Sequence, residues 1–472
     1  MAKATSHFVC QSCGSAAPKW AGKCEACGGW NCMVEEALPQ AVPKGLAPNK
    51  AAKRIEFATL KGEGAKVPRK ITAIGEFDRV TGGGLVPGSV LLVGGDPGIG
   101  KSTLLLQVVG KLAGNPQASS SGAVGQTKCM YVSGEEAVAQ VQLRAARLGL
   151  QDAKVDLASA TSVRDVVAAI EQSAPDLAII DSIQTMYLDQ LDSAPGTVAQ
   201  VRACAHELIR VAKRTGTIVV LVGHVTKEGT LAGPRVLEHM VDAVLYFEGE
   251  RGHQFRILRT VKNRYGPTDE IGVFEMTDSG LQEVPNPSAL FLSERKGDIS
   301  GAVVFAGVEG TRPVLVEIQA LVSPSTLGTP RRAVVGWDSA RLSMIMAVLE
   351  ARCGVQIGSN DVYLNVAGGL RISEPAADMA VAAALLSALT GEPAPQEAVF
   401  FGEIGLSGEV RAVGQTELRL KEAAKLGFGK AFTPPARNKA RGGADIARTE
   451  IGRLADLLPL FANQAMQKRK AG

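Results

Sequence analysis

A glycine-rich stretch near residue 95 carries the clearest chemistry in the chain. Leu91 to Leu106 reads LLVGGDPGIGKSTLLL, which contains the phosphate-loop pattern GxxxxGK[ST] between an apolar run and a Leu-rich run. Glycines let backbone amides face phosphate oxygens, the lysine neutralises phosphate charge and the serine hydroxyl ligates Mg²⁺. The pattern predicts a nucleoside triphosphate site formed by Gly95, Asp96, Pro97, Gly98, Ile99, Gly100, Lys101, Ser102 and Thr103.

Carboxylates follow two further apolar runs. Asp181 ends the run DLAIID, the Walker B pattern, in which the acid holds Mg²⁺ through water. Glu135 and Glu136 follow the run CMYV, so they are expected at the carboxyl edge of a sheet, where one of them can deprotonate the attacking water. The alternative is that both are acids favoured by the dipole at the start of the next helix.

Four cysteines have metal-ligand spacing. Cys10, Cys13, Cys24 and Cys27 form C-x2-C-x10-C-x2-C, with a glycine directly after each pair. Two such knuckles supply four thiolates to one Zn²⁺ and leave no open position, so the metal is expected to be structural. Cys32 is a fifth thiol nearby and is expected to stand aside from the ligands.

Other polar residues at strand ends allow two interpretations each. His224 follows the apolar run TIVVLVG and either senses the γ-phosphate or is a hydrogen-bonded core histidine. Lys262 and Arg264 follow another apolar run, and cations at such positions are usually solvated.

The composition is that of an ordinary globular protein. The 472 residues are 46% hydrophobic and 21% charged, and the net charge of +4 is too balanced to require a nucleic-acid partner, so any basic surface must be local. No apolar segment is long enough for a signal peptide or a membrane span, and scattered cysteines argue against a disulfide framework. We therefore expect a soluble cytoplasmic protein without a membrane partner.

Alternating strand and helix patterns predict an α/β fold with a mostly parallel sheet and flanking helices. The expected domains are a zinc-binding module at 1–34, a Pro- and Lys-rich linker at 35–70, an ATPase domain at 71–285 and a second α+β domain at 286–472. The nearly apolar run from Glu374 to Thr390 is expected to be a core helix.

Several motifs in this order resemble the bacterial RadA (Sms) family of DNA-repair proteins. They are the double CxxC knuckle, GGDPGIGKST, YVSGEE, GHVTKEG, AGPRVLEHMVD and KNRYG. The family carries Phe where this chain has Tyr265, and Thr where it has Cys32. The resemblance extends over essentially the whole chain and implies a RecA-like P-loop ATPase that forms a hexameric ring and drives branch migration on DNA.

The resemblance also implies roles for individual residues. Glu135 becomes the catalytic base, with Glu136 as the fallback, and Lys262 and Arg264 become a finger that reaches the γ-phosphate of the neighbouring subunit. Two loops, about 184–197 and 226–235, correspond to DNA-contacting loops. The implied cofactors are ATP, Mg²⁺ and Zn²⁺. The implied partners are single-stranded and branched DNA, further copies of the chain, a RecA-type recombinase and a replicative helicase or its cofactors, in the nucleoid of the bacterial cytosol.

The second half resembles the proteolytic domain of Lon without its Ser/Lys dyad. The position of the serine falls on Ala376, and Glu417 stands near the position of the lysine. A methyl group cannot attack a carbonyl, so the domain is expected to be a scaffold, with or without contacts from its basic C-terminal tail to DNA. The hypotheses that remain beside a ring ATPase are an ATP-dependent peptidase and a nucleotide-switched binding module with little turnover.

Overall fold

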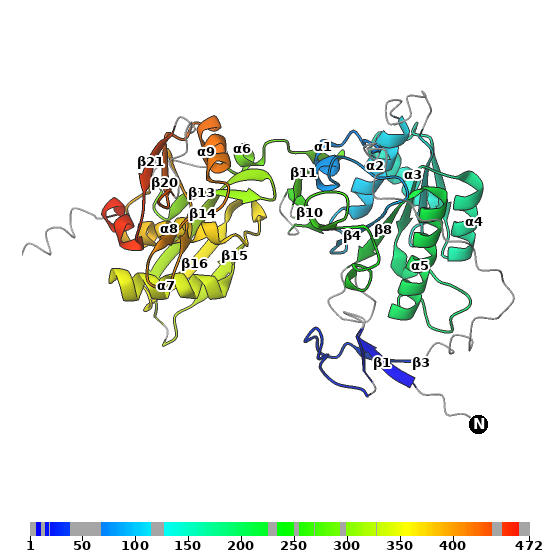
Figure 1. Cartoon of the computed structure of the whole chain (residues 1–472), viewed down its shortest axis with the longest axis horizontal. Helices are drawn as coiled ribbons and strands as arrows, with labels where there is room; N and C mark the ends of the chain where they lie inside the picture. The colour runs from blue at the N-terminus through cyan, green and yellow to red at the C-terminus, as the bar shows by residue number, and fades with distance from the viewer. Residues whose placement is uncertain are drawn as a thin grey trace, which may run out of the picture. The chain divides into compact units, whose positions relative to one another are not determined.

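The computed structural model describes residues 6–10, 15–17, 19–37, 68–114, 127–224, 234–249, 254–268, 270–292, 299–326, 328–436 and 446–461. Cys13, most of the expected linker, residues 226–233 of the second expected DNA loop and most of the basic tail lie outside these ranges. The chain divides into two compact units, Met1–Glu248 with Leu258–Glu283, and Gly249–Ile257 with Val284–Gly472 (Figure 1). Within the described ranges, no helix has the length and apolar character needed to cross a membrane.

The N-terminal residues form a small antiparallel sheet. Its strands are β1 (Ser6–Cys10), β2 (Ala16–Ala17) and β3 (Met33–Ala37), in the order β2-β1-β3. Cys10 pairs with Met33 across β1 and β3. This register brings the first cysteine of the chain beside the residue that follows Cys32.

A nine-stranded sheet forms the centre of the first unit, in the order β12-β11-β10-β9-β4-β8-β7-β5-β6. Its inner pairs β4–β8, β4–β9, β7–β8, β5–β7 and β5–β6 are parallel, and β11–β12 is antiparallel. The strands are β4 (Val90–Gly95), β5 (Cys129–Ser133), β6 (Val155–Ser159), β7 (Leu177–Asp181), β8 (Ile218–His224), β9 (Ala243–Glu248), β10 (Phe255–Asn263), β11 (Ile271–Thr277) and β12 (Gly280–Glu283).

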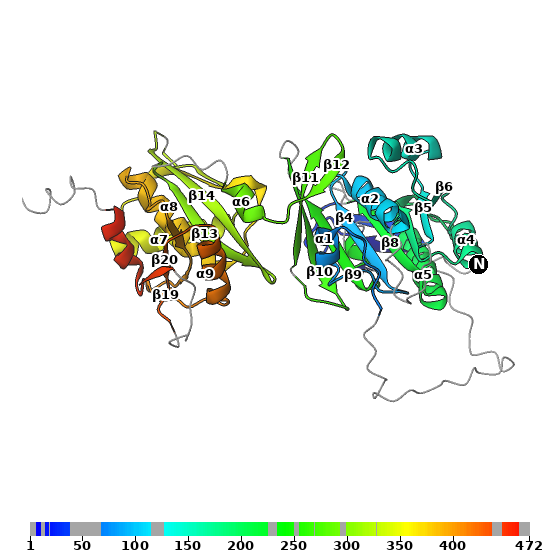
Figure 2. The same ribbon diagram turned by 90° about the horizontal axis from the view of Figure 1, so that it is seen from above.

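Helices cover both faces of this sheet because the strand side chains alternate. Leu91 and Val93 of β4 belong to one buried cluster with α1, α2 and α3, whereas Val90 and Leu92 belong to another with α4 and α5. Figure 2 shows α2 and α5 on opposite sides of the sheet. The helices are α1 (Gly75–Val80), α2 (Lys101–Gly114), α3 (Val138–Arg147), α4 (Val163–Ser173) and α5 (Val198–Thr215). The predicted α/β class is confirmed.

The second unit is built on a seven-stranded sheet in the order β15-β16-β14-β13-β17-β20-β21. Every residue of α8 from Asp378 to Ser387 is buried, so the expected core helix is confirmed, although its first turn, Pro375–Ala377, is a 3₁₀ turn. The elements are α6 (Pro287–Phe291), β13 (Ala302–Glu309), β14 (Arg312–Pro324), β15 (Arg332–Val335), α7 (Ser339–Cys353), β16 (Asn360–Val366), α8 (Asp378–Thr390), β17 (Ala398–Phe400), β18 (Glu403–Ile404), β19 (Val410–Arg411), α9 (Thr416–Lys425), β20 (Lys430–Thr433) and β21 (Ala447–Glu450).

Candidate functional site

The phosphate loop joins the buried strand β4 to helix α2. Gly98 has φ +76° and Gly100 has φ +111°, values that favour glycine. A Cβ atom on Gly95 would lie 2.5 Å from the carbonyl oxygen of Phe247 on the adjacent strand β9. The glycines are therefore required by the backbone, and the loop leads into the N-terminus of a 14-residue helix, which attracts anions.

Lys101 is buried at the first turn of α2. Its Nζ donates hydrogen bonds to the carbonyl oxygens of Gly95 at 2.8 Å and Asp96 at 2.9 Å. Burial lowers the pKa of Lys101 to about 8, against the opposing influence of Asp181, Asp96 and Glu135. Burial of the Lys101 ammonium group is unfavourable, and charged phosphate oxygens would stabilise it more than these neutral carbonyl oxygens do. The loop therefore fits a triphosphate.

Asp181 lies at the end of β7, beside the end of β5. Ser133 and Asp181 are register partners, and Tyr131 of β5 donates its hydroxyl proton to Asp181 Oδ2 at 2.5 Å. Asp181 is buried, and its carboxylate acts electrostatically on Lys101. An oxygen ligand fixed in this way near the phosphate loop fits Mg²⁺. The contribution of Tyr131 was not predicted from the sequence.

Glu135 and Glu136 have different partners. Glu135 Oε1 accepts from Ser182 Oγ at 2.5 Å and lies 3.1 Å from His224 Nε2. The His224 hydrogen bond outweighs burial and, with help from Ser182 and Lys101, lowers the pKa of Glu135 to about 2. Glu136 instead forms an ion pair with Arg144 of α3. Of the two carboxylates, Glu135 is the one whose charge acts on Lys101 of the phosphate loop.

His224 stands beside the phosphate loop because β8 pairs with β4. Gly95 and His224 are register partners, and Gln184 Nε2 donates to the carbonyl oxygen of His224 at 3.2 Å. The imidazole is partly exposed and lies within hydrogen-bonding distance of Glu135. Gln184 itself is buried in the turn Ile183–Thr185, so the loop predicted to begin at 184 begins later than expected.

Gln200 of α5 holds the first of the two predicted DNA loops in place through hydrogen bonds. The buried amide of Gln200 accepts from the Leu188 amide at 2.9 Å and donates to the carbonyl oxygens of Leu188, Leu191 and Ser193. One side chain thus sets the path of the loop. Its amide would have been recognisable in the sequence only as a polar residue in a helical pattern.

Lys262 and Arg264 lie apart from these groups. Lys262 Nζ donates to the carbonyl oxygens of Glu238 at 2.7 Å and Val241 at 2.9 Å, and Arg264 Nη1 lies 3.2 Å from Asp242 Oδ1. Asp242 Oδ2 accepts from the amide of Val90, the first residue of β4, at 2.9 Å. The phosphate loop starts at the other end of β4, about 16 Å away at 3.3 Å per residue. Within one chain, the two cations are not brought to the phosphate loop.

The cysteines of the N-terminal sheet converge. The sulfur atoms of Cys10, Cys27 and Cys32 all lie within 4.8 Å of one another, and Cys24 belongs to the same buried cluster. Several thiols that point at one place are a donor set for zinc. Cys32, which was expected to stand aside from the ligands, has its sulfur 3.3 Å from that of Cys10 and therefore lies beside the predicted ligands.

The second unit places no hydroxyl or amine at the predicted dyad positions. Ala376 is buried, and its carbonyl oxygen accepts from the amide of Gly402 at 2.8 Å. The partly exposed Glu374 forms an ion pair with the buried Arg419, while Glu417 accepts from Arg448 at 2.8 Å. A nucleophile and a base are therefore missing at these positions.

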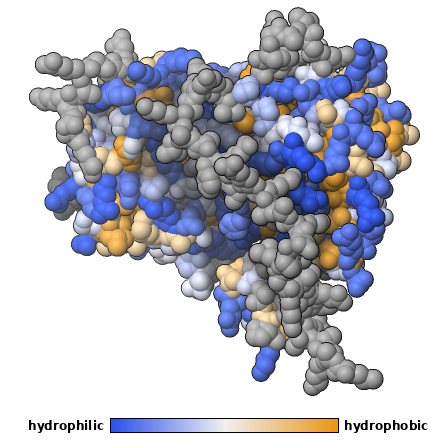
Figure 3. Space-filling model, turned by 45° about the vertical axis from the view of Figure 1, so that its right-hand side comes forward, coloured by the Kyte–Doolittle hydropathy of each residue, from blue (hydrophilic) through white to orange (hydrophobic). Residues whose placement is uncertain are grey.

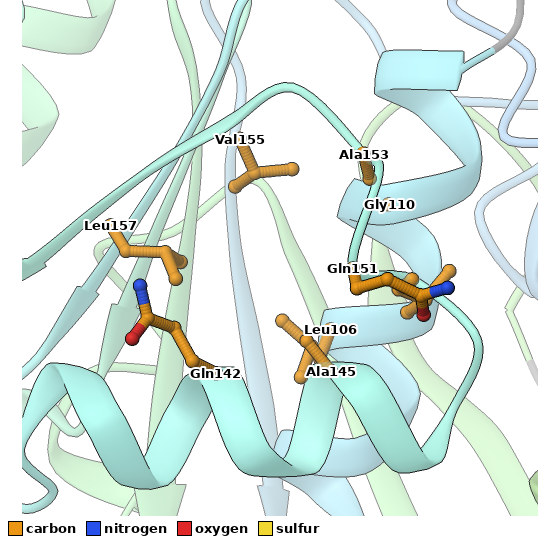
Figure 4. Close-up of a pocket in the computed structure, with 9 residues that line it drawn as sticks. Leu106, Gly110, Gln142, Ala145, Gln151, Ala153, Val155 and Leu157 are labelled. Carbon is orange, nitrogen blue, oxygen red and sulfur yellow. The ribbon is translucent and has the colours of Figure 1, made fainter.

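A cavity of about 330 Å³ on the first unit lies away from the phosphate loop, between α2, α3 and β6 (Figure 4). Its walls include the apolar side chains of Leu106, Val155 and Leu157 and the amides of Gln142 and Gln151. None of the predicted site residues lines it. Figure 3 shows a mainly hydrophilic outer face with hydrophobic patches between the polar residues.

Three family models match the chain. Residues 8–35 match a rubredoxin metal binding domain, residues 74–230 an AAA domain, and residues 320–437 the ChlI subunit of Mg-chelatase. The first two models agree with the predicted structural Zn²⁺ and with the predicted use of ATP and Mg²⁺.

Curated relatives extend the likeness over the whole chain. It is 56% identical to the DNA repair protein RadA of Brucella abortus (strain 2308), with 99% of this chain and 100% of the relative covered. The proteins of the same name from Bacillus subtilis (strain 168) and Pseudomonas aeruginosa (strain PAO1) are 51% and 50% identical, and each alignment covers 92% of this chain and 94% of the relative.

Proposed function

Because the chain belongs to the RadA family of DNA repair proteins, we propose that it is a DNA-stimulated ATPase that assembles as a hexameric ring and drives branch migration of recombination intermediates. The observation that carries the proposal is the position of Lys262 and Arg264, which lie at the opposite end of β4 from the phosphate loop. Two cations on a strand end that cannot serve their own site are suited to serve the site of a neighbour in a closed ring.

The catalytic groups of one chain have separate tasks in this proposal. Lys101 and Ser102 hold the triphosphate, and Asp181 holds the water shell of the metal ion. Mg²⁺, when bound, neutralises the charge that develops on the phosphate oxygens. Glu135 orients the attacking water and accepts its proton, while Ser182 and His224 fix the Glu135 carboxylate at 2.5 Å and 3.1 Å.

The finger residues are held by the segment that follows the second DNA loop. Lys262 is bound by the carbonyl oxygens of Glu238 and Val241, and Arg264 by the carboxylate of Asp242. Because residues 238–242 follow this loop closely in the chain, DNA bound to the loop would act on the groups that hold Lys262 and Arg264. This connection supports a dependence of hydrolysis on DNA, with the loop fastened by Gln200 as the second contact.

The partners follow from the same proposal. Single-stranded and branched DNA would pass the two loops, a RecA-type recombinase would supply the intermediates, and a replicative helicase or its cofactors would act on the product. The site of action would be the nucleoid. A scaffold role for the second unit agrees with the presence of Ala376 at the position where Lon-type proteases have their serine nucleophile.

A complementation experiment tests the finger in trans. Lys101→Ala removes nucleotide binding, and Lys262→Ala removes the finger, so each variant alone should be inactive. An equal mixture should recover about a quarter of the wild-type rate, because half of the sites have an intact phosphate loop and half of those have an intact neighbour in a heterologous ring. The exposed Lys111→Ala serves as the matched surface control.

An inactive mixture would show that the cations do not act across subunits. Negative-stain images of the protein with DNA and a non-hydrolysable nucleotide supply the second criterion, since six-fold rings are expected. Rings without recovery of activity would rule out only the action of Lys262 across subunits. Recovery of activity without rings would rule out the closed hexamer.

A further inference from the structure

The N-terminal zinc-binding module contains one thiol more than a tetrahedral site needs. Two CxxC pairs supply four sulfur atoms, and Cys32 is the fifth. Its side chain is buried in the same cluster as those of Cys10 and Cys24. A surplus thiol inside a thiolate cluster is unusual enough to ask what reaction it makes available.

The pairing of strands β1 and β3 places Cys32 against Cys10. Strands β1 and β3 pair with Cys10 opposite Met33, so Cys32 immediately precedes the partner of Cys10. The Cys32 thiol also lies 3.2 Å from the carbonyl oxygen of Gly29. The sulfur of Cys10 lies 3.3 Å from that of Cys32 and 3.7 Å from that of Cys27. Cys32 is thus the nearer of these two thiols.

We propose that Cys10 and Cys32 form a disulfide when a peroxide oxidises the module, and that zinc is released because the ion loses the Cys10 ligand. The knuckle then acts as a peroxide-responsive modification site. The cluster includes the partly exposed Cys27, whose sulfur lies 3.7 Å from that of Cys10.

The chemistry balances with peroxide as the oxidant. The Cys10 thiolate attacks one peroxide oxygen, the O–O bond breaks, and Cys10 sulfenic acid and hydroxide form. The Cys32 sulfur then attacks the Cys10 sulfur, its proton leaves with the hydroxyl group as water, and the S–S bond forms. The two cysteines together lose two electrons and the peroxide gains them.

Outside this N-terminal cluster, the other cysteines of the described residues offer no competing partner to this pair. Cys129 and Cys204 are buried in the core of the first unit, in strand β5 and helix α5. Cys353 lies in α7 of the second unit. Cys32 is therefore the residue whose replacement should change the outcome of oxidation.

Zinc release from the full-length protein tests the proposal. The zinc-loaded wild type, Cys32→Ser and Cys353→Ser are exposed to hydrogen peroxide in the presence of a chromogenic zinc chelator, and the disulfides are mapped by mass spectrometry. We expect equal zinc contents at the start, release at least several-fold slower in Cys32→Ser than in the other two proteins, and a Cys10–Cys32 peptide in the wild type that thiol reductant removes.

Three results would overturn the proposal. Equal release rates in the wild type and Cys32→Ser would show that Cys32 takes no part. A disulfide mapped within a CxxC pair would assign the reaction to other sulfurs. Loss of zinc from Cys32→Ser before oxidation would make Cys32 a ligand instead of a surplus thiol. None of these outcomes depends on ATP hydrolysis, so the test is independent of the proposed motor function.

Discussion

At the scale of single residues, Glu135 and Glu136 are neighbours in the chain but belong to different environments. Ser182 and His224 hold Glu135 at the edge of the sheet, whereas Arg144 draws Glu136 onto helix α3. The two hydrogen bonds to Glu135 favour its ionised form, which is the form that a general base requires.

We predict that Glu135→Gln lowers the ATP turnover by about 10²- to 10⁴-fold while ATP still binds, because the amide cannot accept the proton of water. Steady-state hydrolysis and nucleotide binding measure the two effects separately. Since the pKa of Glu135 is about 2, the wild-type rate should not fall between pH 8 and pH 6 through protonation of this base.

Glu136→Gln is the matched control. It removes the ion pair with Arg144 and should leave the ATP turnover within a few-fold of the wild type. Loss of turnover in Glu136→Gln together with normal turnover in Glu135→Gln would reverse the assignment.

The sequence predicted which residues end the strands but not how the strands lie side by side. Asp181, Glu135 and His224 were each recognised because an acid or an imidazole followed an apolar run. The order β4-β8-β7-β5 brings these ends together, and that order depends on long-range packing. Tyr131 and Ser182 carried no signal, since a tyrosine in a buried strand and a serine after an aspartate are common.

At the scale of elements, Asp242 joins three parts of the first unit. Its carboxylate accepts from the Val90 amide of β4, lies 2.6 Å from Lys213 Nζ of α5 and pairs with Arg264 after β10. Burial alone would raise the pKa of Asp242, but the hydrogen bonds from Lys213 and Val90 and the charge of Arg264 lower it. The carboxylate therefore stabilises the folded state in its ionised form.

We predict that Asp242→Asn lowers the hydrogen-exchange protection of the Val90 amide by about 10- to 100-fold, equivalent to about 1–3 kcal/mol. The folded-state pKa is depressed, so the stabilisation is complete above the unfolded pKa of about 3.9 and is lost as the pH falls through the folded pKa. The difference between variant and wild type should be largest near neutral pH and shrink in acid.

Asp278→Asn, an exposed carboxylate in the same unit, is the control for this experiment. Unchanged Val90 protection in Asp242→Asn would mean that the amide finds an equally good acceptor. Native-state hydrogen exchange followed by mass spectrometry or NMR gives the comparison.

Helix α5 has recognisable signals at both of its ends. It occupies Val198–Thr215, with Thr197 accepting from the amide of Gln200 at its start and Gly216 in a left-handed conformation at its end. The beginning of the polar segment before α5 was harder to predict, because Gln184 is polar and yet buried. Its neighbours along the chain do not reveal that β8 supplies a carbonyl oxygen to its amide.

At the scale of the whole molecule, the second unit resembles a protease domain but has ion pairs beside the position of the missing serine. Glu374 and Asp378, on either side of Ala376 in the chain, form ion pairs with Arg419 and Arg341, and one partner of each pair is buried. Arg419 Nη1 also donates to the carbonyl oxygen of Ala306 at 2.7 Å. The charged residues beside Ala376 are thus engaged in contacts within the unit.

We predict that Ala376→Ser creates no peptidase. The new hydroxyl has no lysine to activate it, and Glu417 is engaged by Arg448. A serine-reactive fluorophosphonate probe should label neither the wild type nor the variant, while a serine hydrolase in the same tube is labelled. Labelling of the variant at residue 376 would show that another base is in reach.

Strand β4 has the phosphate loop at one end and the contacts of Arg264 at the other, and this affects how the protein behaves on dilution. If the two ends of β4 belong to different catalytic centres, a single chain contains half of each of two centres and no complete centre. The turnover per chain should then rise with total protein until assembly saturates, as mass action requires. A bacterium could thus set the activity of every chain simply by how many chains it makes.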